Sequence, residues 1–321
     1  MVVCTAEDRA EALIGLKVLA LSLARHCPGV ELHAFAPSFP TAFIRWAEGQ
    51  RAVRLHAARP EWRTSWSIKP DVLLDRLDAG YDSVVWMDAD VVLTRDVQEA
   101  WSRFPPQDLL VASEPRWPEG GDGSELRTLG LGELVGRRFD RAINSSVVRV
   151  APAHRPLLAA WRERLSEPSY LDAQSRPIAE RPRHLVGDQD ALAGLIGSAR
   201  FADVPVSLLE PPRDILHAAW STYSSYPVSH RLRHAINGLP VVVHALGRPK
   251  PWEAASAARL SAGLSAYCAV ASAYGDAVGE LAQWMRPMSA IGRASDAIAF
   301  GHPAFRDLLA TLAVSIRRWI E

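Results

Sequence analysis

Two aspartates directly after a short apolar run are the residues best suited to chemistry in this chain. Asp88 and Asp90, with Ala89 between them, follow Val84–Met87, which is rich in β-branched and aromatic residues. Such a run is typical of a strand buried on both faces, and ligands bind beyond the carboxyl ends of strands in open α/β sheets. Two carboxylates there could hold Mn²⁺ or Mg²⁺, and the ion could hold a diphosphate. Acidic residues number 36 in 321, so a chance pair of solvated turn aspartates is the alternative.

A second polar pattern follows another apolar run much later in the chain. His244 comes after three valines and opens the pattern His-x-x-Gly-x-x-Lys-Pro-Trp, which contains Gly247, Lys250 and Trp252. Imidazole is a common ligand of transition-metal ions, so His244 could add a third ligand to the aspartates. Gly247 permits close approach to a phosphate, and the prolines on both sides of Lys250 hold it in an extended segment. A lone histidine after a strand is more often structural, but the full pattern rarely arises by chance.

Two candidate sites precede the aspartates. Thr5 and Ala6 lie where a first strand is expected to turn into a helix, a common place for a nucleotide base or ribose, although Thr5 could instead cap the helix. Lys69 is one of only three lysines among the 36 Lys and Arg residues. Because Pro70 follows it, we expect Lys69 to have an extended backbone conformation directly before a helix. It could then reach phosphate or the carboxylates, unless it is an ordinary surface lysine.

Two later elements also begin with polar residues. Asn144 and Ser145 open a predicted strand, and an Asn amide can bind a sugar hydroxyl both as donor and as acceptor. Asp188 and Gln189 precede an apolar helical run. Asp188 is a good helix cap there, and Asp190 favours the first turn. A capping role does not exclude contact with a ligand, because ligands often meet helix starts.

Hydrophobic periodicity predicts alternating strands and helices around these residues. Strands are expected over residues 2–5, 30–35, 52–55, 84–87, 109–112, 142–150 and 241–243, and helices over 7–25, 41–47, 71–77, 156–165 and 191–196. A β-α-β opening predicts parallel strands. Residues 114–136 are dense in Pro, Gly and charge, which predicts an irregular loop on the acceptor side.

Length and composition exclude several classes of protein. A chain of 321 residues with 48% hydrophobic residues can bury a sizeable core. The net charge of zero and the pI of about 7.2 argue against a nucleic-acid-binding protein. Cys4, Cys27 and Cys268 lack CxxC spacing and are odd in number, which favours small buried hydrophobic residues in a reducing compartment. We see neither a signal peptide nor a run of about 18 apolar residues, so we expect a cytoplasmic protein without a membrane span.

The chain after Trp252 differs in composition from the part before it. It is rich in alanine and predicts helices, so we expect one domain over residues 1–252 and a helical extension over residues 253–321. One apolar stripe there consists of Phe305, Leu308, Leu309, Leu312, Ile316 and Trp319. Packing on the domain or on a second subunit, as in a homodimer, is expected. The arginines beside the stripe leave peripheral membrane contact as the alternative.

Together the motifs resemble the retaining glycosyltransferases of family 8, the glycogenin and galactosyltransferase-like group. The matching pieces occur in the family's order: Trp-Met-Asp-Ala-Asp ending at Asp90, Asn144-Ser145-Ser146, Asp188-Gln189, and His244 through Trp252. The resemblance spans about residues 1–255, and the last motif is the most specific. Two departures occur, because Ser146 stands where the family typically has Gly and Ala245 replaces the usual aromatic residue.

The resemblance implies a GT-A fold, which is a Rossmann-like α/β fold with a mostly parallel central sheet flanked by helices. It implies transfer of a hexose from a nucleotide diphosphate sugar, usually a UDP-sugar, to an unidentified acceptor with retention of anomeric configuration. Mn²⁺ (or Mg²⁺) would be bound by Asp88, Asp90 and His244. The donor would be contacted by Thr5, Ala6, Lys69, Ala89, Asn144, Ser145, Gly247 and Lys250, and Asp188 and Gln189 would lie at the reacting carbon.

Retention is compatible with two mechanisms. Asp188 could act as the nucleophile of a double displacement on the face opposite the leaving group. Alternatively the acceptor attacks from the same face as the departing diphosphate, and Gln189 or Asp188 steadies an oxocarbenium-like state. In both, the metal and Lys250 offset the charge of the leaving group.

Two other functional classes stay open. A metal-dependent sugar nucleotidyltransferase could use the same carboxylate pair, but it would usually have a Gly-rich, basic N-terminal loop, which residues 5–12 lack. A non-catalytic nucleotide-sugar-binding protein would keep the binding motifs without an acceptor site.

Overall fold

The computed structural model describes residues 1–63, 65–114, 123–218, 237–247, 250–252 and 265–275. They form two compact units, which are described separately. Unit 1 comprises Met1–Asp8, Gly29–Asp88 and Trp101–Glu210, and unit 2 comprises Arg9–Pro28, Ala89–Ala100 and the described part of Pro211–Glu321. The expected domain boundary after Trp252 meets residues 253–264, and the apolar stripe lies within 276–321. Both lie outside the described residues, so the C-terminal extension and the homodimer stay predictions.

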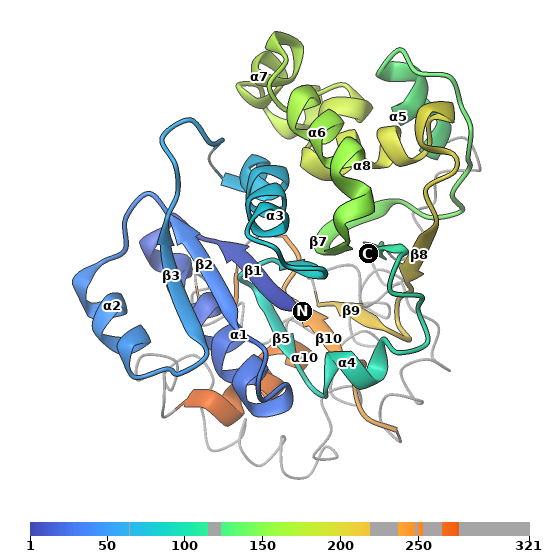
Figure 1. The fold of residues 1–321 in the computed structure, drawn as a ribbon. Coiled ribbons are helices and arrows are strands. Elements are labelled where there is room, and N and C mark those ends of the chain that lie inside the picture. The colour runs from blue at the N-terminus through green and yellow to red at the C-terminus, as the bar shows by residue number, and fades with distance from the viewer. Residues whose placement is uncertain (64, 115–122, 219–236, 248–249, 253–264, 276–321) are drawn as a thin grey trace, which may run out of the picture. The chain divides into compact units, whose positions relative to one another are not determined.

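A seven-stranded sheet in the order β3-β2-β1-β4-β7-β6-β8 forms the centre of unit 1 (Figure 1). The strands are β1 Val2–Ala6, β2 Leu32–Ala36, β3 Val53–Ala57, β4 Val84–Met87, β6 Leu109–Ser113, β7 Ile143–Val150 and β8 Val206–Leu209. Neighbours are parallel from β3 through β4 and between β6 and β8, whereas β7 is antiparallel to β4 and β6. The expected mixed α/β fold with a mostly parallel sheet is confirmed.

Helices of unit 1 pack on this sheet and on one another. They are α2 Thr41–Glu48, α3 Lys69–Asp78, α5 Gly123–Gly130, α6 Arg155–Arg164, α7 Pro168–Gln174 and α8 Asp188–Ile196. Helix α3 contacts β1, β4 and α6, and α8 contacts β7, α5 and α6 (Figure 1). The core between them buries whole aromatic side chains, among them Trp86, Trp161 and Tyr170. The end of β4, the start of β7 and the starts of α3 and α8 are therefore held by one continuous core.

Unit 2 is built on a three-stranded sheet in the order β5-β10-β9. Its elements are α1 Leu13–His26, β5 Val91–Leu93, α4 Val97–Ala100, β9 Ile215–His217, β10 Val242–His244 and α10 Ser265–Ala271. Strand β10 is antiparallel to β5 and parallel to β9. The core includes Val18 of α1, Val92, Val243 and Tyr267. No helix in the described part of the chain is both long enough and apolar enough to cross a membrane.

Three local expectations were wrong. The helix expected from residue 7 begins at Leu13, after a 3₁₀ turn over Ala10–Ala12. Lys69 is the first residue of α3 and is not extended, because a 3₁₀ turn over Ser65–Ile68 leads directly into the helix and Pro70 occupies its first turn. The segment expected to be irregular contains α5, and Thr128 of α5 and Leu131 directly after it pack against Gly194 of α8.

An aromatic cluster on β2 and β3 contains two histidines with lowered pKa values. The His56 ring stacks on Phe35 with centroids 4.7 Å apart, and it lies 4.7 Å from the His33 ring. The guanidinium of Arg76 contacts His33 Nδ1 at 3.1 Å. Burial, followed by the charges of His33 and Arg76, lowers the pKa of His56 from 6.5 to about 4, and burial also lowers the pKa of His33.

We expect unit 1 to lose stability as the pH falls from about 6.5 to about 4. Because the folded pKa of His56 lies below its unfolded value of 6.5, this histidine binds more protons in the unfolded chain than in the folded protein throughout this pH window. Chemical denaturation at a series of pH values should show a steeper decline for the wild type than for His56→Gln, which cannot titrate. Equal slopes for the two proteins would contradict this account of the cluster.

Candidate active site

Lys69 is the centre of a buried polar cluster in unit 1. Its side chain is 3% exposed, and Nζ lies 3.0 Å from Asp88 Oδ1 and 3.2 Å from Asp188 Oδ2. Nζ also donates to Ser145, at 2.7 Å to the hydroxyl and 3.2 Å to the carbonyl oxygen. The Ser145 hydroxyl in turn donates to Asp188 Oδ2 at 2.7 Å. The alternative of a surface lysine is therefore wrong, and three predicted site residues lie together with Lys69.

The charges in this cluster depend on one another. Burial alone would lower the pKa of Lys69, but the carboxylates of Asp188 and Asp88 outweigh it and raise that pKa. Burial raises the pKa of Asp188, and the Lys69 ammonium and the Ser145 hydroxyl oppose this increase. At neutral pH the lysine is thus a cation held between the side chains of Asp88 and Asp188.

Asp88 follows the last residue of β4 and is fixed by two groups on the central strands. Its backbone N–H donates to the Ser146 carbonyl at 2.8 Å, which continues the pairing of β4 with β7. The indole N–H of Trp86 donates to Asp88 Oδ1 at 2.7 Å. The side chain of Asp88 stays 28% exposed, more than those of Lys69 and Asp188. Part of its carboxylate is therefore open to a ligand.

A carboxylate that sequence reasoning missed connects two predicted sugar-binding residues. Glu114 Oε1 accepts hydrogen bonds from the amide of Asn144 at 3.2 Å and from the amide of Gln189 at 3.1 Å. Asn144 Oδ1 accepts the backbone N–H of Ser146 at 2.9 Å, so both ends of the Asn144 amide are engaged within the protein. Gln189 is half-buried, whereas Asn144 is buried. Gln189 is the more accessible of the two to a ligand.

The start of α8 corrects the expected helix cap. Gly187 is the capping residue, and Asp188 is the first residue of the helix. The carboxylate of Asp190 accepts the Gly187 N–H at 3.0 Å and pairs with Arg127 Nε at 2.6 Å. Asp190 thus closes the first turn, and the side chain of Asp188 is left to the Lys69 cluster.

Thr5 and Ala6 belong to β1. Helix capping by Thr5 is wrong, because α1 begins only at Leu13 with Ala12 as its capping residue. The Thr5 hydroxyl is buried and has no hydrogen-bond partner among the described residues, and Ala6 is half-buried. Ser146, which departs from the family pattern, also has a buried hydroxyl without a partner in the described part of the chain. A buried hydroxyl without a partner is an unsatisfied group that a ligand could complete.

In unit 2, strand register places His244 beside Asp90. Antiparallel pairing sets His244 opposite Val91, the residue after Asp90, and the Ala245 N–H donates to the Asp90 carbonyl at 3.0 Å. His244 Nε2 then lies 3.3 Å from Asp90 Oδ1, and both side chains are largely buried. Lys250 Nζ contacts the other oxygen, Oδ2, and donates to the Ala245 carbonyl at 2.7 Å. The structure thus brings together the aspartate, histidine and lysine of two distant motifs.

The pair formed by Asp90 Oδ1 and His244 Nε2 fits a divalent cation. Neighbouring ligands of an octahedral ion with bonds of about 2.1 Å lie roughly 3 Å apart, close to the 3.3 Å observed. Oδ1 is buried and has no hydrogen-bond partner among the described residues. Burial would raise the pKa of the Asp90 carboxyl, but Lys250 and His244 hold it well below its usual range. Asp90 is therefore an anion, as a metal ligand must be.

Trp252, at the end of the histidine motif, and Ala89, between the two aspartates, both pack against Gly15 of α1. A Cβ atom built on Gly15 would lie 2.5 Å from Cη2 of Trp252 and 2.7 Å from the Ala89 carbonyl oxygen. Gly15 thus allows α1 to approach both groups. Gly247 has a positive φ of 79°, and a Cβ there would meet no atom of the described residues within 4 Å, as expected for a backbone position open to a ligand.

We expect Gly15→Ala to destabilise unit 2 by about 1–3 kcal/mol, the usual cost of overpacking. The added methyl group must displace the Trp252 ring or the backbone of Ala89, and Ala89 joins Asp88 to Asp90. Chemical denaturation measures the cost. Gly49→Ala is the control, because the nearest atom to its Cβ among the described residues, the Trp46 carbonyl oxygen, lies 3.4 Å away. A Gly15→Ala protein as stable as that control would contradict the proposed close approach.

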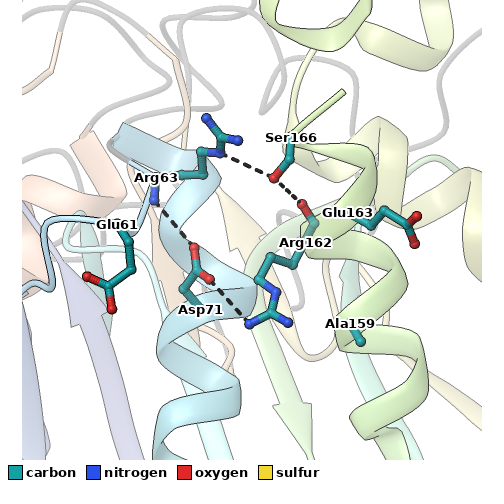
Figure 2. A pocket seen from close by; sticks show the side chains of 7 residues that line it. All are labelled: Glu61, Arg63, Asp71, Ala159, Arg162, Glu163 and Ser166. Atoms are coloured by element: carbon teal, nitrogen blue, oxygen red, sulfur yellow. Dashed lines mark hydrogen bonds and ion pairs between the residues drawn. The ribbon is translucent and has the colours of Figure 1, made fainter. Parts of the chain in front are cut away.

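A pocket of about 350 Å³ lies between α3 and α6 of unit 1 (Figure 2). Its walls carry charges of both signs, and Asp71 accepts the Arg63 N–H at 3.4 Å and lies 4.0 Å from Arg162. Burial raises the pKa of Asp71. None of the predicted site residues lines this pocket.

Comparisons with known proteins come from structure alone. No protein-family model matches the chain, and no curated protein matches it in sequence. The apo structure of the bifunctional glycosyltransferase WbbM is similar, with a TM-score of 0.51 and 14% identity. That match covers 78% of this chain and 46% of WbbM, so this chain corresponds to less than half of WbbM's length.

A second similar structure is the galactosyltransferase LgtC in complex with donor and acceptor sugar analogues. Its TM-score is 0.50 at 17% identity, and the match covers 92% of this chain and 99% of LgtC. At such identities the likeness concerns the fold alone. Together with the mostly parallel seven-stranded sheet and its flanking helices, it shows that this chain has the GT-A fold of these glycosyltransferases.

Proposed function

We propose that the protein is a metal-dependent glycosyltransferase that transfers a hexose from a nucleotide diphosphate sugar, most simply a UDP-sugar, to an acceptor with retention of configuration. The observation that carries this proposal is the buried pair of Asp90 Oδ1 and His244 Nε2, 3.3 Å apart, on a GT-A fold. Asp88 is only two residues from Asp90 in the chain, and we propose its partly exposed carboxylate as the third ligand.

Groups around these ligands suit a diphosphate. A bound Mn²⁺ or Mg²⁺ would act as a Lewis acid that offsets the charge of the leaving diphosphate. Lys250 contacts Asp90 and is a buried cation, and we assign it to the same phosphate oxygens. Gly247 leaves space for close backbone approach. One solved structure of LgtC holds donor and acceptor sugar analogues, which supports a donor sugar and an acceptor as the ligands of this fold.

The cluster in unit 1 suits the sugar of the donor. Asp188 Oδ2 already accepts from Ser145 and pairs with Lys69, and both interactions reduce its strength as a nucleophile. Gln189 is half-buried and is oriented by Glu114. We therefore propose attack by the acceptor from the face of the departing diphosphate, with the Gln189 amide oxygen near the developing positive charge. Asp188 would act as a positioning residue for Lys69 and Ser145.

A panel of UDP-linked glucose, galactose and N-acetylglucosamine with Mn²⁺ tests the proposal. Water can take the place of the missing acceptor, so we expect slow UDP release with one sugar nucleotide and none after chelation of the metal. Thermal stabilisation by the same compound should accompany it.

The products separate the three functional classes. Release of UDP and free sugar with the α configuration of the donor supports a retaining transferase. A parallel reaction with added pyrophosphate tests the second class: conversion of UDP-sugar and pyrophosphate to UTP and a sugar phosphate would instead identify a nucleotidyltransferase. Metal-dependent stabilisation without any turnover would identify a binding protein, and neither binding nor turnover across the panel would contradict the proposal.

A further inference from the structure

A second histidine lies against the proposed metal ligand in unit 2. Parallel pairing of β9 with β10 sets His217 beside His244, and their rings meet edge to face with centroids 5.1 Å apart. The two Nδ1 atoms are 2.9 Å apart and form a hydrogen bond. His217 is fully buried and His244 is 3% exposed, so water does not readily replace this bond. Sequence reasoning did not single out His217.

The two ring nitrogens of His244 face different partners. Nε2 faces Asp90 Oδ1, and Nδ1 faces His217. A nitrogen that binds a cation must offer a lone pair, so a neutral His244 ring with a metal at Nε2 carries its hydrogen on Nδ1. In a bond between two Nδ1 atoms one must donate and the other accept. Nδ1 of His217 must then be the acceptor.

We propose that His217 is a positioning residue that accepts the Nδ1–H of His244 and thereby holds Nε2 of His244 open for the divalent cation. This inference rests on the proposed metal site. In the reverse arrangement His217 donates, His244 carries its hydrogen on Nε2, and that hydrogen faces Asp90 where the cation should bind. The cation and the acceptor role of His217 therefore favour the same tautomer of His244. Loss of such a supporting partner typically weakens metal binding by roughly 10–100-fold.

Two substitutions separate the hydrogen bond from the packing. His217→Asn keeps an acceptor, because the Asn Oδ1 atom can occupy the place of the histidine Nδ1. His217→Leu fills a similar volume without an acceptor. Mn²⁺ binding is measured by electron paramagnetic resonance of the free ion, with saturating UDP present. We expect His217→Leu to bind Mn²⁺ roughly 10–100-fold more weakly than the wild type. His217→Asn should stay within a few-fold of the wild type.

The outcomes are distinguishable. If the wild type binds Mn²⁺ and both variants bind it equally well, or both are weakened equally, the proposed role of His217 is overturned while the metal site stands. If the wild type itself does not bind Mn²⁺ with UDP, the proposed metal site fails, and the role of His217 with it. Circular dichroism and thermal melting confirm that each variant is folded.

A measurement on the wild type avoids the variants altogether. Long-range ¹H–¹⁵N correlation spectra of the imidazole rings, recorded with the diamagnetic Mg²⁺ and UDP, report which ring nitrogens carry hydrogen. We expect hydrogen on Nδ1 of His244 and on Nε2 of His217. Hydrogen on Nδ1 of His217 in the metal-loaded protein would overturn the inference, even if His217→Leu does not fold.

Discussion

Replacing Asp90 by asparagine is expected to abolish metal-dependent turnover of the donor, with a fall in kcat/KM of at least about 100-fold. The substitution keeps the shape of the side chain but removes the anion that faces His244 Nε2 and contacts Lys250. A neutral amide is a weaker ligand for a hard divalent cation, so Mn²⁺ affinity should fall as well. Steady-state kinetics with the reactive sugar nucleotide and Mn²⁺ titration measure the two effects.

The same substitution leaves the buried Lys250 ammonium without its carboxylate, which could lower stability by itself. Circular dichroism and the melting temperature therefore accompany the kinetics. Glu99→Gln is the matched control, because it neutralises an exposed carboxylate on α4 of the same unit. A folded Asp90→Asn protein with normal turnover, while the control is also normal, would remove the metal site from the proposed mechanism.

Replacing Lys69 by methionine is expected to lower the free energy of unfolding by about 3–5 kcal/mol, the typical cost of removing one partner of a buried ion pair. Methionine fills a similar volume but leaves Asp88 and Asp188 facing each other without the cation. The loss should be smaller at acidic pH, because Asp188 already has a raised pKa and can take up a proton. Donor turnover should fall in parallel.

A double-mutant cycle with Asp188→Asn tests that explanation. If the lost stability reflects an unpaired buried carboxylate, the double variant should be more stable than the sum of the two single losses implies. Simple additivity in chemical denaturation at pH 7 would show that Lys69 and Asp188 do not depend on each other. Lys17→Met, on a half-buried lysine of α1 outside this cluster, is the matched control.

The strands could be predicted because buried parallel strands are continuous apolar runs, as at Val84–Met87, and the carboxylates follow them directly. The pairing of Asp90 with His244 could also be predicted. Both residues come directly after apolar runs, and the segments around them match motifs of the family that the sequence resembles. Most predicted residues of unit 1 lie close to one another, and so do those of unit 2. Their roles as ligands of a metal and a sugar nucleotide stay predictions.

What the sequence could not reveal depends on tertiary contacts. Glu114 carries no motif, and it matters only because the β6–β7 pair brings it to Asn144 and α8 brings Gln189 to it. His217 resembles any other histidine until strand register sets it against His244. Lys69 was expected to be extended, but a preceding 3₁₀ turn overrides the local effect of Pro70. Local sequence patterns thus identified the residues that belong to motifs, and long-range packing decided which of them meet and added Glu114 and His217.

The most direct test of the central claim is the anomalous scattering of Mn²⁺ in crystals of the protein grown with Mn²⁺ and UDP. We predict one strong anomalous peak within bonding distance of Asp90 Oδ1 and His244 Nε2, with an Asp88 carboxylate oxygen and diphosphate oxygens completing the coordination. Clear density for UDP with no manganese at these side chains, or manganese bound elsewhere, would contradict it.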